Sequence, residues 1–141
     1  LYSSSEKPVG VSGTVTTKLQ ASGGLLLEKS GIVCNASGAK KGSWNRGMVV
    51  PPKSFAPDSK YLLKLEWTSM GIEKGSQFYV NFISKQDKKK NRQNKGWTGA
   101  SGKSGNVEMV LETNQFEDWE LIIGVRGAGH MVVDHVTIQA M

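Results

Sequence analysis

Hydrophobic and polar residues alternate with a period of two along most of the chain, and no long stripe of helical period is present. The alternation is clearest in residues 60–68, 77–84 and 119–126, where an aromatic or aliphatic residue takes every second position. Such a pattern is typical of strands that have one face in the core and the other toward solvent. Trp67 and Trp119 keep phase with aliphatic neighbours, so we expect both in the core.

Shorter apolar runs between turn signals indicate further strands. They span residues 11–19, 25–28, 32–36, 46–50, 107–111 and 131–139. Residues 29–31 form a turn signal between two of these runs, and Pro51 and Pro52 end another. About eight or nine strands in a chain with 17 glycines predict an all-β, antiparallel sandwich or barrel. A single domain fills residues 1–141, and we interpret residues 1–10 as a linker remnant.

The composition is that of a soluble globular domain, with 38% hydrophobic and 21% charged residues. No run approaches the roughly 20 apolar residues that a membrane span needs. The single cysteine, Cys34, lies in a short apolar run and has no second cysteine with which to form an internal disulfide. Since free cysteine packs like a small hydrophobic group, we expect Cys34 to be a buried strand residue.

The net charge of +6 is unevenly distributed. Residues 85–95 contain six cations and only one acid, Asp87, whereas the rest of the chain is nearly neutral. Two interpretations of this basic segment remain open: a solvated loop, or a contact surface for an anionic polymer. Nucleic acid is the less favoured polymer, because the cations cluster in one loop rather than along a groove.

Three motifs are similar to those of one group of carbohydrate-binding modules. Residues 61–67 (YLLKLEW) resemble the Y-x-L-x-F strand of that group, and residues 77–82 resemble its next strand. Trp119 and residues 131–138 (MVVDHVTI) resemble its closing W…I-D-x-V-x-L signature. The group includes families four, nine, sixteen and twenty-two and has a galactose-binding-like jelly-roll fold. The resemblance covers roughly residues 44–139, and the order and spacing of the motifs carry it.

The resemblance implies a jelly roll of two sheets. The strands near residues 44–50, 77–84, 95–98 and 119–126 then share a concave sheet, across which a glycan lies in the modules of this group. The strands at Val11, Tyr61, Val107 and Met131 form the other sheet.

Strand parity identifies the outward side chains of the expected concave sheet. They are Tyr79, Asn81, Glu120 and Arg126, with Trp97 near the rim. Sugars stack their C–H faces on aromatic rings and pair their hydroxyls with side chains that donate and accept hydrogen bonds. Arg126 suits a two-pronged contact with a carboxylate or sulfate. The alternative is that Tyr79 is plain surface and that Glu120 pairs with Arg126.

Trp44 and Arg46 are further candidates for carbohydrate contact, but their phase is ambiguous. Alternation with Met48 and Val50 places both side chains in the core. A bulge or loop at residues 43–45 would instead turn them outward.

The resemblance also implies a structural calcium ion, and Asp134 stands at the position of a family ligand. The N-terminal Asn-Gly-x-Phe-Glu segment that supplies another ligand in such modules does not occur in this sequence. Because calcium takes about six to eight oxygens, the alternative for Asp134 is a turn or bulge residue.

No convergent catalytic pair is visible in the sequence. His130 and His135 are the only histidines, and neighbours on a strand point to opposite faces, so Asp134 and His135 form no dyad without a bulge. We therefore expect a non-catalytic domain that is not an enzyme. We also expect it to be a monomer.

The expected role is that of a secreted binding module that brings a linked catalytic domain, a glycoside hydrolase or polysaccharide lyase, to a polysaccharide or oligosaccharide. The basic segment favours an acidic glycan. The alternative function is a structural or adhesion β-sandwich without affinity for glycans.

Overall fold

The computed structural model describes residues 25–72, 75–87, 92–97 and 104–141, with 92–97 as backbone only. The predicted strand at 11–19 lies outside these residues. Among them no helix is long and apolar enough to cross a membrane. The strands are β1 (Leu25–Ala36), β2 (Trp44–Val50), β3 (Lys60–Ile72), β4 (Gln77–Ile83), β5 (Arg92–Trp97), β6 (Ser104–Glu112), β7 (Glu120–Arg126) and β8 (Gly129–Ala140).

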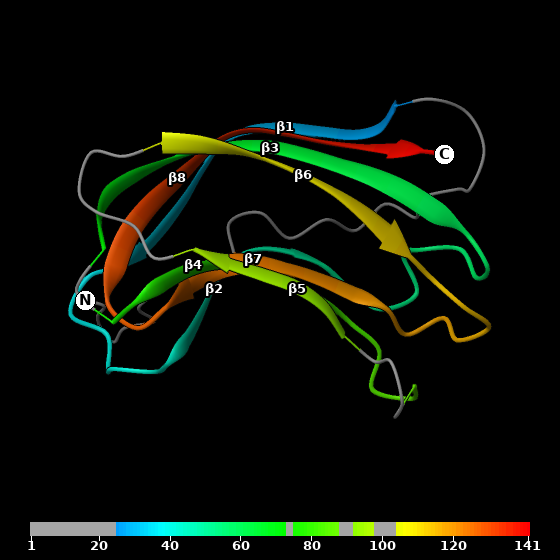
Figure 1. Cartoon of the computed structure of the whole chain (residues 1–141), viewed down its shortest axis with the longest axis horizontal. Coiled ribbons are helices and arrows are strands. Elements are labelled where there is room, and N and C mark those ends of the chain that lie inside the picture. Colours follow the sequence, from blue (N-terminus) through cyan, green and yellow to red (C-terminus); the bar gives the residue numbers. More distant parts are fainter. Residues whose placement is uncertain (1–24, 73–74, 88–91, 98–103) are drawn as a thin grey trace.

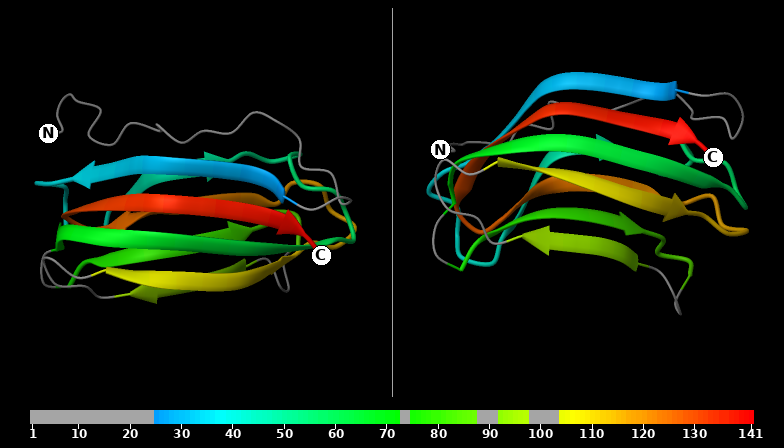
Figure 2. Two further views of the ribbon diagram at one scale, coloured as in Figure 1. Left: turned by 90° about the horizontal axis from the view of Figure 1, so that it is seen from above. Right: turned by 45° about the horizontal axis from the view of Figure 1, so that its top comes forward.

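The strands form two antiparallel sheets that face each other (Figure 1). The strand orders are β1-β8-β3-β6 and β2-β7-β4-β5, so most connections cross from one sheet to the other, as in a jelly roll. Seen from above, the strands of both sheets run in similar directions (Figure 2). The predicted all-β antiparallel jelly roll is confirmed, and so is the membership of the sheet that contains β2, β4, β5 and β7.

The structure corrects one strand prediction. Residues 25–28 and 32–36 are not two strands with a turn between them but parts of one edge strand, β1. Gly31 takes a positive φ of 68° inside this strand, which only glycine adopts easily. The pairing with β8 keeps the same register on both sides, from Ser30 opposite His135 to Ile32 opposite Val133. Backbone pairing therefore overrides the local turn signal.

The core lies between the sheets and consists of the inward residues of both. Trp119 stacks on Phe82 with ring centroids 4.9 Å apart, and Phe55 from the β2–β3 connection meets Phe82 edge-on at 4.9 Å. Trp67 and Trp119 are 7% and 2% exposed, which confirms their prediction as core residues. Cys34 is fully buried on β1, as expected.

Both sheets arch in the same direction (Figure 1). The outer side of the β2-β7-β4-β5 sheet is therefore hollow, and we call it the concave face. The outer side of the β1-β8-β3-β6 sheet bulges toward solvent, and we call it the convex face. These two surfaces present the polar side chains of the strands, because the opposite sides are filled by the core.

Candidate functional site

The side chains of the concave face follow from alternation along β4 and β7. Leu121, Ile123 and Val125 are fully buried in the core, so their neighbours on β7 point the other way. The register places Tyr79 beside Gly124 and Asn81 beside Ile122. The outward direction predicted for Tyr79, Asn81, Glu120 and Arg126 is thus what the structure shows.

A bulge in β2 decides the phase of Trp44 and Arg46. The pairing with β7 shifts between Arg46 and Met48, so Met48 lies in the core while Arg46 and Trp44 both point outward. The bulge residue is Gly47, where an added Cβ would lie only 2.8 Å from Cβ of Cys34. The irregularity lies at residues 46–48 rather than at 43–45. The placement in the core that simple alternation predicts for Trp44 and Arg46 is therefore wrong, because a bulge reverses the parity.

Trp44 is an exposed aromatic residue with a fixed orientation. Its side chain is 52% exposed. Its ring meets the Tyr79 ring edge-on at 4.8 Å between centroids, and the Arg126 guanidinium lies 4.7 Å from the Trp44 ring centroid. A cation over an indole ring is attracted by the electron-rich face. The two contacts hold the indole while leaving about half of it open to solvent.

Tyr79 supports this arrangement from below and is not itself open to solvent. It is only 3% exposed, and its hydroxyl donates to the carbonyl of Asn45 at 3.4 Å. Burial raises the pKa of the Tyr79 phenol well above its usual value, and Arg46 nearby opposes the shift. The alternative that Tyr79 is plain surface does not hold, because Trp44 and its neighbours cover it.

The opposite end of the concave face carries a charged hollow. Arg46 Nη1 lies 3.7 Å from Glu120 Oε2, and the Glu120 side chain is 14% exposed. Glu120 therefore pairs with Arg46 and not with Arg126. The hollow has a volume of about 310 Å³, and its lining residues are Arg46, Pro52, Ile83, Lys85, Asp118 and Glu120.

The wall of the hollow is fixed by Asp118, which the sequence analysis assigned no role. Its carboxylate accepts hydrogen bonds from the Ser84 hydroxyl and from the backbone N–H groups of Lys85 and Gln86. These bonds position Lys85 at the edge of the hollow. No periodic pattern could identify Asp118, because it lies in a connection and acts on a strand end more than 30 residues away in sequence.

Asn81 is half-buried in the middle of the concave face, between Trp44 at one end and the hollow at the other. Trp97 is the last residue of β5 and pairs with Phe78 through its backbone, but its side chain lies outside the described residues. The same holds for most of the basic segment 85–95. Whether the predicted site residues contact a glycan stays a prediction.

Asp134 lies far from the concave face, on the convex face. Its carboxylate accepts a hydrogen bond from the Thr68 hydroxyl at 2.7 Å. A register shift between β3 and β8 makes Asp134 a bulge residue, so Asp134 and His135 both point outward, contrary to the expected alternation. His135 contacts Ser30 and Glu28 instead of Asp134.

The calcium ion stays a prediction of the resemblance. The described part of the chain gathers no group of three or more His, Cys, Asp or Glu side chains that could hold a metal ion. Asp134 is engaged by Thr68 and belongs to no such group among these residues. On its own it does not meet the oxygen-rich requirement of calcium.

No family model matches the chain, and no curated protein matches it. Solved structures of similar fold include the CBM22-1–GH10 modules of endo-1,4-β-D-xylanase 10B from Clostridium thermocellum in complex with xylohexaose, at a TM-score of 0.48 and 13% identity over 78% of this chain. This chain spans only 21% of that xylanase chain.

Two further structures are similar to this chain. The first, a family 16 carbohydrate-binding module, has a TM-score of 0.45 and 14% identity, over 70% of this chain and 72% of that one. The second, a pilus structure of Bacillus endospore appendages, has a TM-score of 0.43 and 12% identity, over 90% of this chain and 97% of that one. At such identities the likenesses concern the fold alone, and in fold this chain is similar to carbohydrate-binding modules of families 22 and 16.

Proposed function

We propose that this domain is a non-catalytic carbohydrate-binding module that holds a glycan across its concave face. The observation that carries the proposal is Trp44: a half-exposed indole, fixed by Tyr79 and Arg126, on the hollow side of a sheet. An ordered and exposed aromatic residue offers a surface for the C–H face of a sugar without the entropic cost of ordering a mobile side chain.

The rest of the concave face supplies polar partners for sugar hydroxyls. Arg46 and Lys85 donate hydrogen bonds, Glu120 accepts them, and Asn81 does both. Trp44, the first residue of β2, lies opposite Arg126 at the end of β7, and Glu120 is the first residue of β7. Six residues of extended strand correspond to about 20 Å. This length suits a stretch of several sugar units better than a single monosaccharide.

The glycan that we propose carries acidic groups. Arg46, Arg126 and Lys85 lie on or beside the concave face, and the basic segment 85–95 follows directly after β4. A positive field concentrates polyanions, and an arginine or lysine pairs well with a carboxylate or sulfate. The two carboxylates that line the hollow are both engaged, Glu120 by Arg46 and Asp118 by three donors.

That engagement also supports a role without catalysis. Glycoside hydrolysis uses two carboxylates that exchange protons or attack the sugar, whereas Asp118 and Glu120 are held in structural contacts. We propose that the domain is part of a larger secreted, polysaccharide-active enzyme. Binding through this module would raise the local concentration of the polysaccharide at the linked catalytic domain.

The test is calorimetric titration with neutral and uronate-bearing oligosaccharides, comparing the parent chain with Trp44→Ala. The matched control is Met70→Ala, because Met70 is 55% exposed on the other sheet. Loss of an aromatic anchor costs about 2 kcal/mol or more, so we expect at least about 30-fold weaker binding for Trp44→Ala and unchanged binding for Met70→Ala.

Equal binding by Trp44→Ala and the parent chain would remove the concave face as the site. No affinity of the parent chain for any glycan would leave the structural or adhesion sandwich as the function. For the acidic preference, affinity for uronate-bearing glycans must fall between about 0.02 M and about 0.5 M salt, since ions screen exposed charges. A salt-independent affinity contradicts it.

A further inference from the structure

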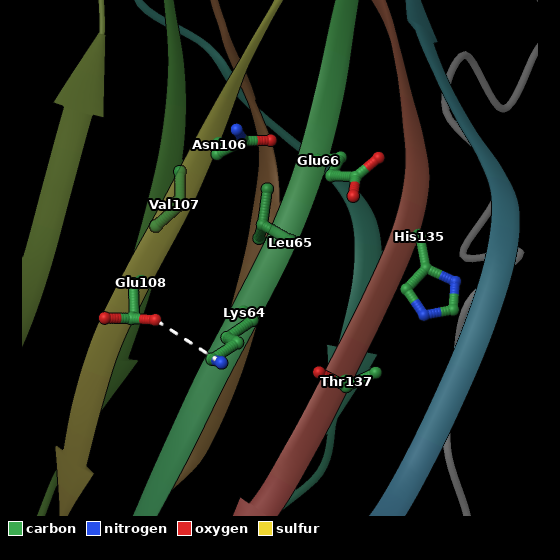
Figure 3. Close-up of a pocket in the computed structure, with 8 residues that line it drawn as sticks. All are labelled: Lys64, Leu65, Glu66, Asn106, Val107, Glu108, His135 and Thr137. Atoms are coloured by element: carbon green, nitrogen blue, oxygen red, sulfur yellow. Dashed lines mark ion pairs between the residues drawn. The ribbon is translucent and has the colours of Figure 1, made fainter.

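The convex face carries a second polar pocket, on the opposite side of the domain from Trp44. Its volume is about 330 Å³. Figure 3 shows its side chains projecting from three neighbouring strands, β3, β6 and β8. The polar lining residues are Lys64, Glu66, Asn106, Glu108, His135 and Thr137, and the buried Leu65 and Val107 complete the lining.

The polar side chains of this pocket form two rows across the strands. In one row Glu66 lies opposite Asn106 on one side and His135 on the other. In the next row Lys64 lies opposite Glu108 and Thr137. Neighbours are about 5 Å apart across the strands and about 7 Å apart along them. The result is a regular array of hydrogen-bonding groups on one surface.

Two groups of the array are not engaged by other described residues. Lys64 Nζ pairs with Glu108 Oε2 at 3.6 Å, and His135 Nε2 lies 3.2 Å from Glu28 Oε2. The side chains of Glu66 and Asn106 are exposed and make no hydrogen bond or ion pair with any residue that the structure describes. They therefore offer a free carboxylate and a free amide next to each other in the pocket.

We infer that this pocket is a second saccharide site, for an uncharged sugar chain. The inference rests on the glycan-binding role proposed above. Sugar hydroxyls donate and accept at once, and the array offers donors (Lys64, Asn106) next to acceptors (Glu66, Glu108). The carboxylates of Glu28, Glu66 and Glu108 outnumber the single lysine, so an acidic sugar is repelled although the chain as a whole has a charge of +6.

The two faces of the domain then differ in ligand. The concave face takes a glycan with acidic groups, and the convex face takes a neutral one. One domain could hold two chains, or two stretches of one chain, on its opposite sides. Simultaneous engagement would strengthen attachment to a polysaccharide surface well beyond either single affinity.

The test is an amide-resolved NMR titration of the full chain carrying Trp44→Ala with cellohexaose, xylohexaose and laminarihexaose. We expect saturable shifts at the amides of Glu66, Asn106 and His135 with at least one of the three. Adding Glu66→Ala and Asn106→Ala should abolish these shifts. Both side chains are exposed, so the fold should survive. The control is Glu112→Ala, an exposed glutamate of β6 outside the pocket.

The second site is overturned if none of the three sugars moves these amides, or if the shifts persist in the variant that lacks Glu66 and Asn106. Failure of the proposed function has a different signature: in the parent chain, uronate-bearing glycans would leave the amides around Trp44 and Arg126 unchanged. The two outcomes are therefore read from different residues in two separate titrations.

Discussion

Asn45 is the buried polar anchor beneath the Trp44 end of the concave face. It is 8% exposed, at the start of β2. Its side-chain amide donates to the carbonyls of Val125 at 3.2 Å and Gly127 at 3.0 Å, and it also contacts the carbonyl and hydroxyl of Ser43. It thus ties the first residue pair of β2 to the end of β7 and to the turn before β8.

Replacing Asn45 by alanine removes the donor and leaves two buried carbonyls without it. Losing one partner of a buried hydrogen bond costs about 1–3 kcal/mol. The two bonds are of ordinary length, and we assign each about 1–2 kcal/mol. We therefore expect Asn45→Ala to lower the free energy of unfolding by about 2–4 kcal/mol. Asn45→Asp should cost at least as much near neutral pH, because a carboxylate would face the same carbonyls without a proton to donate.

The assay is urea unfolding followed by tryptophan fluorescence. At a slope of about 2 kcal/mol per M, the midpoint should fall by about 1–2 M for Asn45→Ala. Asn106→Ala is the control, because the exposed side chain of Asn106 has no partner among the described residues. Its free energy of unfolding should stay within about 0.5 kcal/mol of that of the parent chain. A midpoint of Asn45→Ala equal to that of the control would show that Asn45 does not anchor this end of the sheet.

Three further predictions concern Cys34, Gly124 and Asp118. Burial raises the pKa of the Cys34 thiol from 9.0 to about 12. Between these two pKa values the unfolded chain loses a proton that the folded chain keeps, so the free energy of unfolding should fall by roughly 1.4 kcal/mol per pH unit as pH rises. In urea unfolding from about pH 8 to about pH 10.5, Cys34→Ala should show a shallower fall than the parent chain. Equal slopes for the two proteins would contradict the burial of the thiol. Gly124→Ala would place a methyl group against the Asn45 carbonyl oxygen, so we expect the free energy of unfolding in urea to fall by about 1–3 kcal/mol. A Gly124→Ala variant as stable as the parent chain would refute the close contact. Asp118→Ala removes the acceptor of three hydrogen bonds and should lower stability by about 1–3 kcal/mol in thermal unfolding; no change would mean that the wall of the hollow stands without it.

Alternation along the chain was enough to predict most of the fold. In β3, β4 and β7 an apolar residue takes every second position over most of the strand, because one face of each strand packs against the other sheet. The same pattern identified Trp67 and Trp119 as core residues. The assignment of four strands to the concave sheet came from the family resemblance and agrees with the observed topology.

The sequence alone determined where most of the strands lie and which side of each regular strand is apolar. Only the tertiary structure decided which side chains meet on the concave face. The bulge between Arg46 and Met48 turns Trp44 outward, and the one at Asp134 puts Asp134 and His135 on the same side. The reason is physical: one extra residue reverses the parity of everything before it, and where that residue fits depends on contacts with distant strands, such as the approach of Gly47 to Cys34.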